Sequence, residues 1–145
     1  MAESRSRAWR RSGIGVGFAL LTVLVSGVPA HAENSSYNGK PPSYNNCVGD
    51  ARVIYSVRMR EKDYGWSSDQ KVQLLYSKRC RTAWGRIING YSDCYVSVIR
   101  LDRSRRYDGQ TLSPMINDAG YQSFVYGYCP ILAPGTANHG TTGRY

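Results

Sequence analysis

Two short runs of basic side chains are the residues of this sequence best suited to binding chemistry. The first run is Lys78, Arg79 and Arg81, and the second is Arg103, Arg105 and Arg106. An arginine guanidinium forms paired hydrogen bonds with phosphate or carboxylate, and neighbouring tyrosines can stack on rings. We therefore predict contacts with an anionic polymer, the alternative being that both runs are solvated turns.

Trp66 is a further candidate binding residue because it stands in a polar stretch, Gly65-Trp66-Ser67-Ser68, that predicts a loop. A tryptophan at an exposed loop tip is suited to contact a ligand. The alternative is a ring folded back over the edge of a sheet.

Few residues of this sequence are suited to catalysis. His31 lies in a segment that we predict to be removed, which leaves His139 as the single histidine. Ribonuclease, serine hydrolase and cysteine protease mechanisms need a placed histidine as acid or base. Carboxylate pairs remain available for glycoside hydrolysis, but most of the candidates lie at turns, where Asp is common for backbone reasons. These candidates are Asp50, Glu61, Asp63, Asp69, Asp93, Asp102, Asp108 and Asp118. We expect a non-catalytic protein without a cofactor, and the alternative is a secreted toxin or a small hydrolase using carboxylates.

Residues 1–32 are typical of a signal peptide. Four arginines precede an uncharged run at 13–26, and Ala30-His31-Ala32 forms a small-x-small cleavage site. The alternative is a membrane anchor, but the run is shorter than the roughly 20 apolar residues that span a bilayer. Arg10-Arg11 leaves twin-arginine export open beside ordinary secretion.

Cleavage near Ala32 changes the charge of the chain. It removes four of 19 Lys and Arg and one of 10 Asp and Glu, which leaves a net charge of +6. We predict a secreted, basic, monomeric protein with no transmembrane anchor after cleavage. Its expected partner is an anionic cell-wall polymer or another extracellular macromolecule.

The clearest strand pattern lies at residues 71–88. Val72, Leu74 and Tyr76 alternate with polar residues, which predicts an apolar strand face. Leu75 breaks the alternation and indicates a strand covered on both faces. Residues 82–88 predict a second strand, with a helix as the alternative.

The rest of the chain predicts more short strands separated by turns. They are expected at 50–59, 94–101, 110–116 (an edge, because of Pro114) and 121–129, with Asn89-Gly90 and Asp108-Gly109 as hairpin turns. This pattern predicts an all-β domain, a small antiparallel sandwich or barrel. We place an irregular arm at 33–46, the β domain at 47–129 and a loose tail at 130–145, the alternative being a tail whose Tyr145 is tied down.

Four cysteines remain after cleavage: Cys47, Cys80, Cys94 and Cys129. An even number in a small exported chain favours two disulfides. Three pairings are possible, and a zinc site is the alternative, although close Cys-x-x-Cys spacing is missing. Cys47 precedes the first strand and Cys80 follows the second, so antiparallel pairing would bring these two together. The same reasoning joins Cys94 to Cys129.

These features resemble the YjfA-like family, small exported proteins of Gram-positive bacteria that form a domain of unknown function. The matching residues are Tyr37-Asn38-Gly39-Lys40-Pro41-Pro42, Cys47, Asp50-Ala51, Leu75-Tyr76-Ser77, Cys80, Thr82-Ala83-Trp84, Arg86-Ile87, Met115 and Asp118. The sequence departs from the family pattern at Asn46 and Lys78, and Cys94 and Cys129 are additions to it. The resemblance implies an exported, disulfide-bonded β-protein and supplies no catalytic residues.

Overall fold

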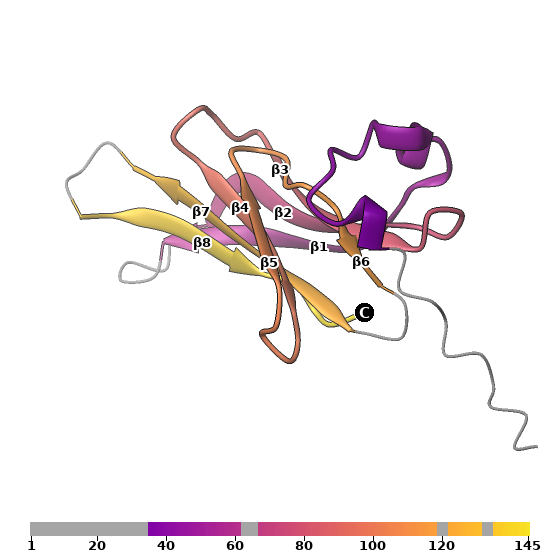
Figure 1. Cartoon of the computed structure of the whole chain (residues 1–145). Helices are drawn as coiled ribbons and strands as arrows, with labels where there is room; N and C mark the ends of the chain where they lie inside the picture. The colour runs from indigo at the N-terminus through magenta and orange to yellow at the C-terminus, as the bar shows by residue number, and fades with distance from the viewer. Residues whose placement is uncertain (1–34, 62–66, 119–121, 132–134) are drawn as a thin grey trace, which may run out of the picture.

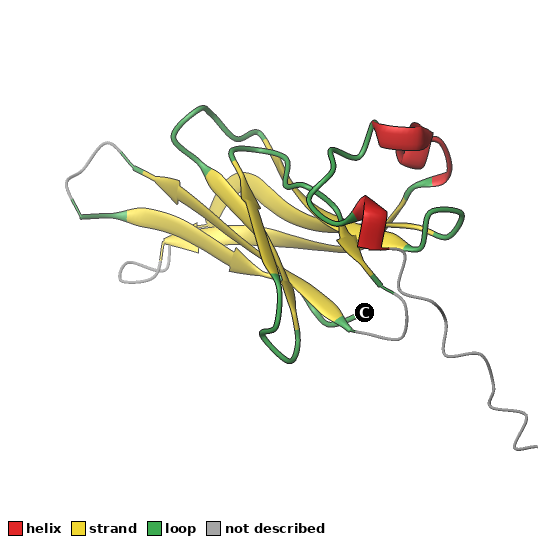
Figure 2. Ribbon diagram, in the orientation of Figure 1, coloured by secondary structure: helices red, strands yellow, loops and turns green. Residues whose placement is uncertain are grey.

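The structure, a computed structural model, describes residues 35–61, 67–118, 122–131 and 135–145. The predicted signal peptide and Trp66 lie outside the described residues. Two 3-10 segments precede eight strands in this part of the chain (Figures 1 and 2). The bounds are η1 Ser35–Tyr37, η2 Tyr44–Asp50, β1 Arg52–Glu61, β2 Ser67–Ser77, β3 Thr82–Ile88, β4 Tyr95–Arg100, β5 Arg106–Gly109, β6 Ile116–Asn117, β7 Ser123–Pro130 and β8 Ala137–Thr141.

The strands form one antiparallel sheet in the order β5-β4-β7-β8-β1-β2-β3-β6. The sheet curls into a nearly closed barrel, because β4 and β7 come back across the interior to contact β3. The β8 strand lies between β7 and β1 (Figure 1). It thereby joins two halves of the barrel, which are β5-β4-β7 and β1-β2-β3-β6. The predicted all-β fold is confirmed, and β3 is a strand, as predicted, and not a helix.

The interior of the barrel is filled by aliphatic side chains from both halves. Its fully buried members include Met59, Val72, Leu74, Val96, Val98, Ile116 and Val125. Gly85 of β3 allows the halves to approach closely, since a Cβ atom there would lie 2.6 Å from a methyl group of Val96 and another of Val125. A glycine within a strand often marks such an approach.

The N-terminal arm covers the outer face of β2 and β3. Leu75 and Trp84, which lie opposite each other in the two strands, are buried there with Met115 and the Cys47–Cys80 disulfide. The β2 strand is therefore covered on both faces, as Leu75 predicted. Backbone hydrogen bonds of 2.8–2.9 Å between the arm and Met115 hold this cover in place.

Both predicted disulfides are confirmed. Cys47 pairs with Cys80 and Cys94 pairs with Cys129, with Cα–Cα distances of 5.7 and 4.2 Å. The pairings follow from the antiparallel registers of β1 with β2 and of β4 with β7. Each bond closes a loop of more than 30 residues, which contributes roughly 3–4 kcal/mol in the loop-entropy model.

The predicted loose tail is wrong for residues 137–145. The β8 strand pairs with β7 along its whole length, and the Thr142 N–H donates to the Val125 carbonyl at 2.9 Å. Tyr145 and Ser123 exchange two backbone hydrogen bonds, of 2.8 and 3.0 Å. Gly, Thr and Asn disfavour a strand locally, but the open edge of β7 supplies a partner, and this tertiary context overrides local propensity.

The β1 strand, predicted at 50–59, is irregular near its start. A bulge between Val53 and Tyr55 turns Ile54 toward the core and leaves those two side chains 45% and 38% exposed. A bulge inserts one unpaired residue into a strand. The residues beyond it then point to the opposite face of the sheet from the one that simple alternation predicts.

Three predicted connections differ as well. Asn89-Gly90 does not form a hairpin, because β3 pairs with β2 and β6 while β4 lies in the other half of the barrel. The predicted edge strand at 110–116 is an irregular run along β3, regular only from Ile116. Asp108-Gly109 is not a hairpin turn, because both residues belong to β5 together with Arg106.

Candidate anion-binding site

The turn between β2 and β3 is held by the arm. The Asp50 carboxylate accepts hydrogen bonds from the Ser77 hydroxyl at 2.5 Å and from the Arg79 N–H at 2.8 Å. These bonds lower the pKa of Asp50 below its ordinary value. Arg79 Nη2 in turn donates to the carbonyl groups of Asn45 and Asn46, whose backbones have φ of 49° and 52°. Arg79 therefore fastens the arm to the turn.

A first basic pocket of about 430 Å³ opens beside this turn. It forms because β1 and β8 pair through only two residue pairs, at the far end of β1. Its lining residues are Asp50, Arg52, Ile54, Tyr76, Lys78 and Tyr145. Arg52 and Lys78 are exposed, and the rings of Tyr76 and Tyr145 lie 4.9 Å apart. The pocket thus combines two cations and the Asp50 carboxylate with two aromatic rings.

Asp118 lies beside this pocket and contacts its wall. Its carboxyl group is hydrogen-bonded to Tyr76, with the charges of Arg81 and Arg100 nearby. Burial raises the pKa of Asp118 to about 6, although the hydrogen bond and the two arginines oppose this rise. Burial and the Asp118 carboxylate together raise the pKa of Tyr76 to about 12. Tyr76 therefore remains a neutral phenol, whereas Asp118 changes charge near pH 6.

A second basic pocket, of about 350 Å³, lies on the other side of the C-terminal segment. Its lining residues are Leu101, Arg103, Phe124, Thr141, Thr142, Gly143 and Arg144. The Arg103 guanidinium lies 5.5 Å from the centre of the Phe124 ring, a cation–π contact. Arg144 and Tyr145, consecutive in the chain, line different pockets, so the two pockets flank these last residues.

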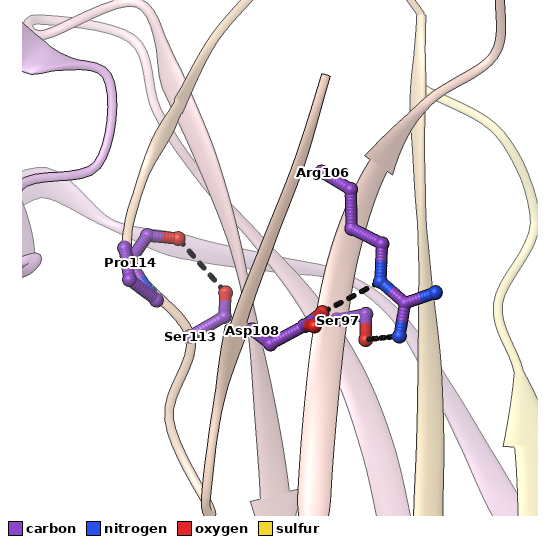
Figure 3. A network of polar contacts seen from close by, with 5 residues as sticks. All are labelled: Ser97, Arg106, Asp108, Ser113 and Pro114. Atoms are coloured by element: carbon purple, nitrogen blue, oxygen red, sulfur yellow. Dashed lines mark hydrogen bonds and ion pairs between the residues drawn. The ribbon is translucent and has the colours of Figure 1, made fainter. Parts of the chain in front are cut away.

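Arg106 is held on the outer face of the sheet. Its Nε donates to Asp108 at 2.7 Å and its Nη2 donates to the Ser97 hydroxyl at 3.0 Å, as Figure 3 shows. The bond to Asp108 raises the pKa of Arg106 above its ordinary value. The guanidinium is therefore fixed in orientation while 51% of the side chain remains exposed. Its neighbour Arg105 is half-buried.

The structure divides the predicted basic runs between different roles. Lys78 lines the first basic pocket and Arg103 lines the second. Arg79 holds the arm, and Arg81 lies beside Asp118. Trp66 lies outside the described residues, so its predicted role stays a prediction.

Sequence reasoning missed two cations of these pockets. Arg52 was not among the predicted binding residues, and Arg144 fell in the predicted loose tail. An apolar or aromatic residue next to each arginine in the sequence is the only local sign that the arginine could line a pocket. Tyr145 follows Arg144 directly, but nothing in the sequence places it against Tyr76.

The outer face of β4, β7 and β8 carries an aromatic cluster that the sequence did not predict. Tyr95 stacks on Tyr128 with ring centres 4.9 Å apart, and Tyr128 meets His139 edge-on at 5.0 Å. The Tyr126 hydroxyl is hydrogen-bonded to His139 Nδ1 at 2.6 Å. The contribution of His139 to this cluster was missed because the residue fell in the predicted loose tail, whereas in the structure it lies in β8, paired with β7.

The opposite end of the barrel, here called the acidic end, carries a pocket with two carboxylates, and the exposed Arg60 and Lys71 lie nearby. A pocket of about 530 Å³ is lined by Ser68, Asp69, Gln70, Tyr91, Asp93, Pro130, Ile131 and Asn138. Asp69 and Asp93 are both exposed at this pocket. Asp69 and Tyr76 stand seven residues apart on β2, which separates the acidic end from the first basic pocket by roughly 23 Å.

Metal-binding clusters and membrane-spanning helices are both missing from the described residues. No group of three or more His, Cys, Asp or Glu side chains in this part of the chain is placed to hold a metal ion. Among the same residues, no helix has the length and apolar character needed to cross a bilayer.

The fold and its pockets define a small, disulfide-bonded all-β protein with a basic end, suited to an oxidising environment. Residues 35–125 match the family described as "Protein of unknown function (DUF2690)", and the chain belongs to this family. It is also similar to "Uncharacterized protein YjfA" of Bacillus subtilis (strain 168), with 36% identity over 101 residues. The alignment covers 63% of this chain and 60% of that relative, less than two thirds of its length. No solved structure matches the chain.

Proposed function

We propose that this protein is a secreted, non-catalytic binding protein that holds an anionic polymer of the cell exterior at its basic end. The observation that carries the proposal is the pair of basic pockets on either side of the C-terminal segment. Each pocket combines two cationic side chains with at least one aromatic ring, and the Asp50 carboxylate of the first pocket already accepts hydrogen bonds from Ser77 and Arg79. Cations beside ring faces are suited to a chain that carries both charge and apolar surface.

The distribution of charge along the barrel supports the same proposal. The cations Arg52, Lys78, Arg103 and Arg144 line the pockets at one end, whereas Asp69 and Asp93 lie at the other. A polyanion approaching this molecule is attracted to the cations of the basic end. Both disulfides support a site outside the cytoplasm, in agreement with the predicted signal peptide.

A hydrolase using carboxylates is the second candidate function, favoured by the two aspartates in the acidic pocket. Glycoside hydrolysis needs one carboxyl group with a raised pKa beside a second, ionised one. The carboxyl group with a pKa of about 6 is Asp118, which contacts Tyr76, whereas Asp69 and Asp93 lie at the opposite end. The carboxyl group with the raised pKa and the two exposed aspartates therefore lie at opposite ends of the barrel and cannot act as one acid–base pair. Binding is the better supported function.

The test is the affinity of the purified protein for glycerol phosphate teichoic acid and for heparin across a salt series. The variant Lys78→Gln/Arg103→Gln removes one cation from each pocket. The control Arg60→Gln/Lys71→Gln removes the same charge from exposed positions toward the other end of β1 and β2. Exposed ion pairs contribute about 0.2–1 kcal/mol each, so losing two of them should weaken binding by about twofold to about thirtyfold.

Two results would count against the proposal. The first is an equal loss of affinity in the pocket variant and in the control, which would mean that the net charge of the protein, and not the pockets, determines the affinity. The second is affinity that does not change with salt, since screening weakens contacts between exposed charges. Polymer fragments that accumulate with time would favour the hydrolase.

A further inference from the structure

Aromatic side chains form a row on the outer face of the sheet. Phe124, Tyr126 and Tyr128 are alternate residues of β7 and point to the same side, roughly 7 Å apart along the strand. Tyr95 of β4 lies directly opposite Tyr128 and stacks on it, and His139 of β8 lies opposite Tyr128 on its other side. These five side chains, all half-buried, are called the aromatic row below.

The aromatic row begins inside the second basic pocket and is accompanied by cations. Phe124 and Arg103 line that pocket together. Farther along, the charge of Arg106 acts on Tyr126, and Asp108 on the same face is paired with Arg106. Burial raises the pKa of Tyr126 to about 12, so its phenol is neutral and does not repel an anion. The row therefore begins at the basic end beside Arg103 and runs from there toward the acidic pocket, whose lining residues Pro130 and Asn138 lie near Tyr128 and His139.

Resting on the function proposed above, we propose that the polymer is an acidic polysaccharide, whose sugar rings pack along the aromatic row while its charged groups meet the arginines. Tyrosine and histidine side chains offer ring surface together with hydroxyl and nitrogen groups for sugar hydroxyls. A protein partner would need an apolar centre. The most exposed large apolar side chains of the described residues, Val48, Val53 and Leu112, lie elsewhere.

The test compares a polymer built of sugar rings with one that has no rings. Heparin and glycerol phosphate teichoic acid are titrated at one salt concentration against the variant Tyr95→Leu/Tyr128→Leu. The control Tyr44→Leu/Tyr55→Leu removes two exposed tyrosines, one from the arm and one from β1. Stacking of a ring on an aromatic side chain is a strong contact in single-stranded nucleic acid complexes. We expect the row variant to lose about tenfold in heparin affinity and to bind teichoic acid as before.

Three results would overturn the inference: unchanged heparin affinity in the row variant, an equal loss for both polymers, or tighter binding of a single-stranded oligonucleotide than of heparin. If the double variant melts earlier than its control, the single variant Tyr128→Leu repeats the comparison. The proposed function fails separately, because it is tested by Lys78 and Arg103, whose substitution leaves the Tyr95–Tyr128 stack in place.

Discussion

Substituting Asp118 by Asn is expected to stabilise the protein at neutral pH. The folded chain holds the Asp118 proton until about pH 6, whereas an ordinary carboxyl group releases it near 3.8. Between these values the folded state binds more protons than the unfolded state, so stability falls as pH rises. Burial, the cause of the raised pKa, therefore penalises the charged form fully above pH 6 and not at all below about pH 4.

The size of the effect follows from the two pKa values. Their difference of about two corresponds to about 3 kcal/mol for a fully shielded group. The carboxyl group of Asp118 is only half-buried, and screening by solvent reduces the penalty to about 1–1.5 kcal/mol. The amide that replaces this carboxyl group would be neutral at every pH, and its oxygen can still accept a hydrogen bond from Tyr76. The Asp118→Asn variant should therefore gain about 1 kcal/mol at about pH 7.5 and nothing at about pH 3.5.

Urea unfolding at the two pH values, with the disulfides intact, measures this difference. The control is Asp102→Asn, because the Asp102 carboxylate accepts hydrogen bonds from the Ser104 N–H and hydroxyl, and these lower its pKa. Its loss should destabilise the protein at the higher pH and have no effect at low pH, the opposite sign. If Asp118→Asn gave no gain at the higher pH, or the same gain at both pH values, the reasoning about its burial would be refuted.

Three further substitutions test the packing that positions the pockets. Gly85→Ala should cost about 1–3 kcal/mol in urea unfolding, because its new methyl group would overlap two valine methyls of the opposite half; unchanged stability would mean that the halves can separate. Replacing Cys47 and Cys80 together by Ala should cost roughly 3–4 kcal/mol, measured the same way, and a loss below about 1 kcal/mol would contradict it. Arg79→Gln should expose the arm to limited proteolysis while leaving β2 and β3 resistant, since its bonds to two backbone carbonyls would be lost; an arm that stays resistant would count against this role.

The sequence predicted well those strands whose pattern is decided by the core. Val72, Leu74 and Tyr76 face the barrel interior and Leu75 faces the arm, as their alternation indicated. The disulfides followed as soon as the strands were taken as antiparallel neighbours, because each cysteine stands next to the end of a strand. In these places, local pattern and tertiary structure agree.

Other features depend on contacts that no local pattern contains. Residues 137–141 become a strand because β7 offers an open edge, and β1 changes face at Ile54 because of a bulge. The candidate site was only partly predictable for the same reason. Lys78 and Arg103 stood out as members of basic runs, but Arg144 and His139 depend on the placement of β8 and its neighbouring residues.

The central place of the last strand, between β7 and β1, has a consequence for how the chain matures. The neighbouring strands β1, β2 and β3 can pair as soon as they emerge, and the Cys47–Cys80 bond can form within this part of the chain. The barrel can close only after β8 has arrived to join β1, the first strand of the sheet in chain order. Until then β1 and β7 keep unpaired edges, which are sites of aggregation in folding intermediates. We therefore expect truncation before Ala137 to reduce the yield of soluble protein more than it reduces the formation of the Cys47–Cys80 bond.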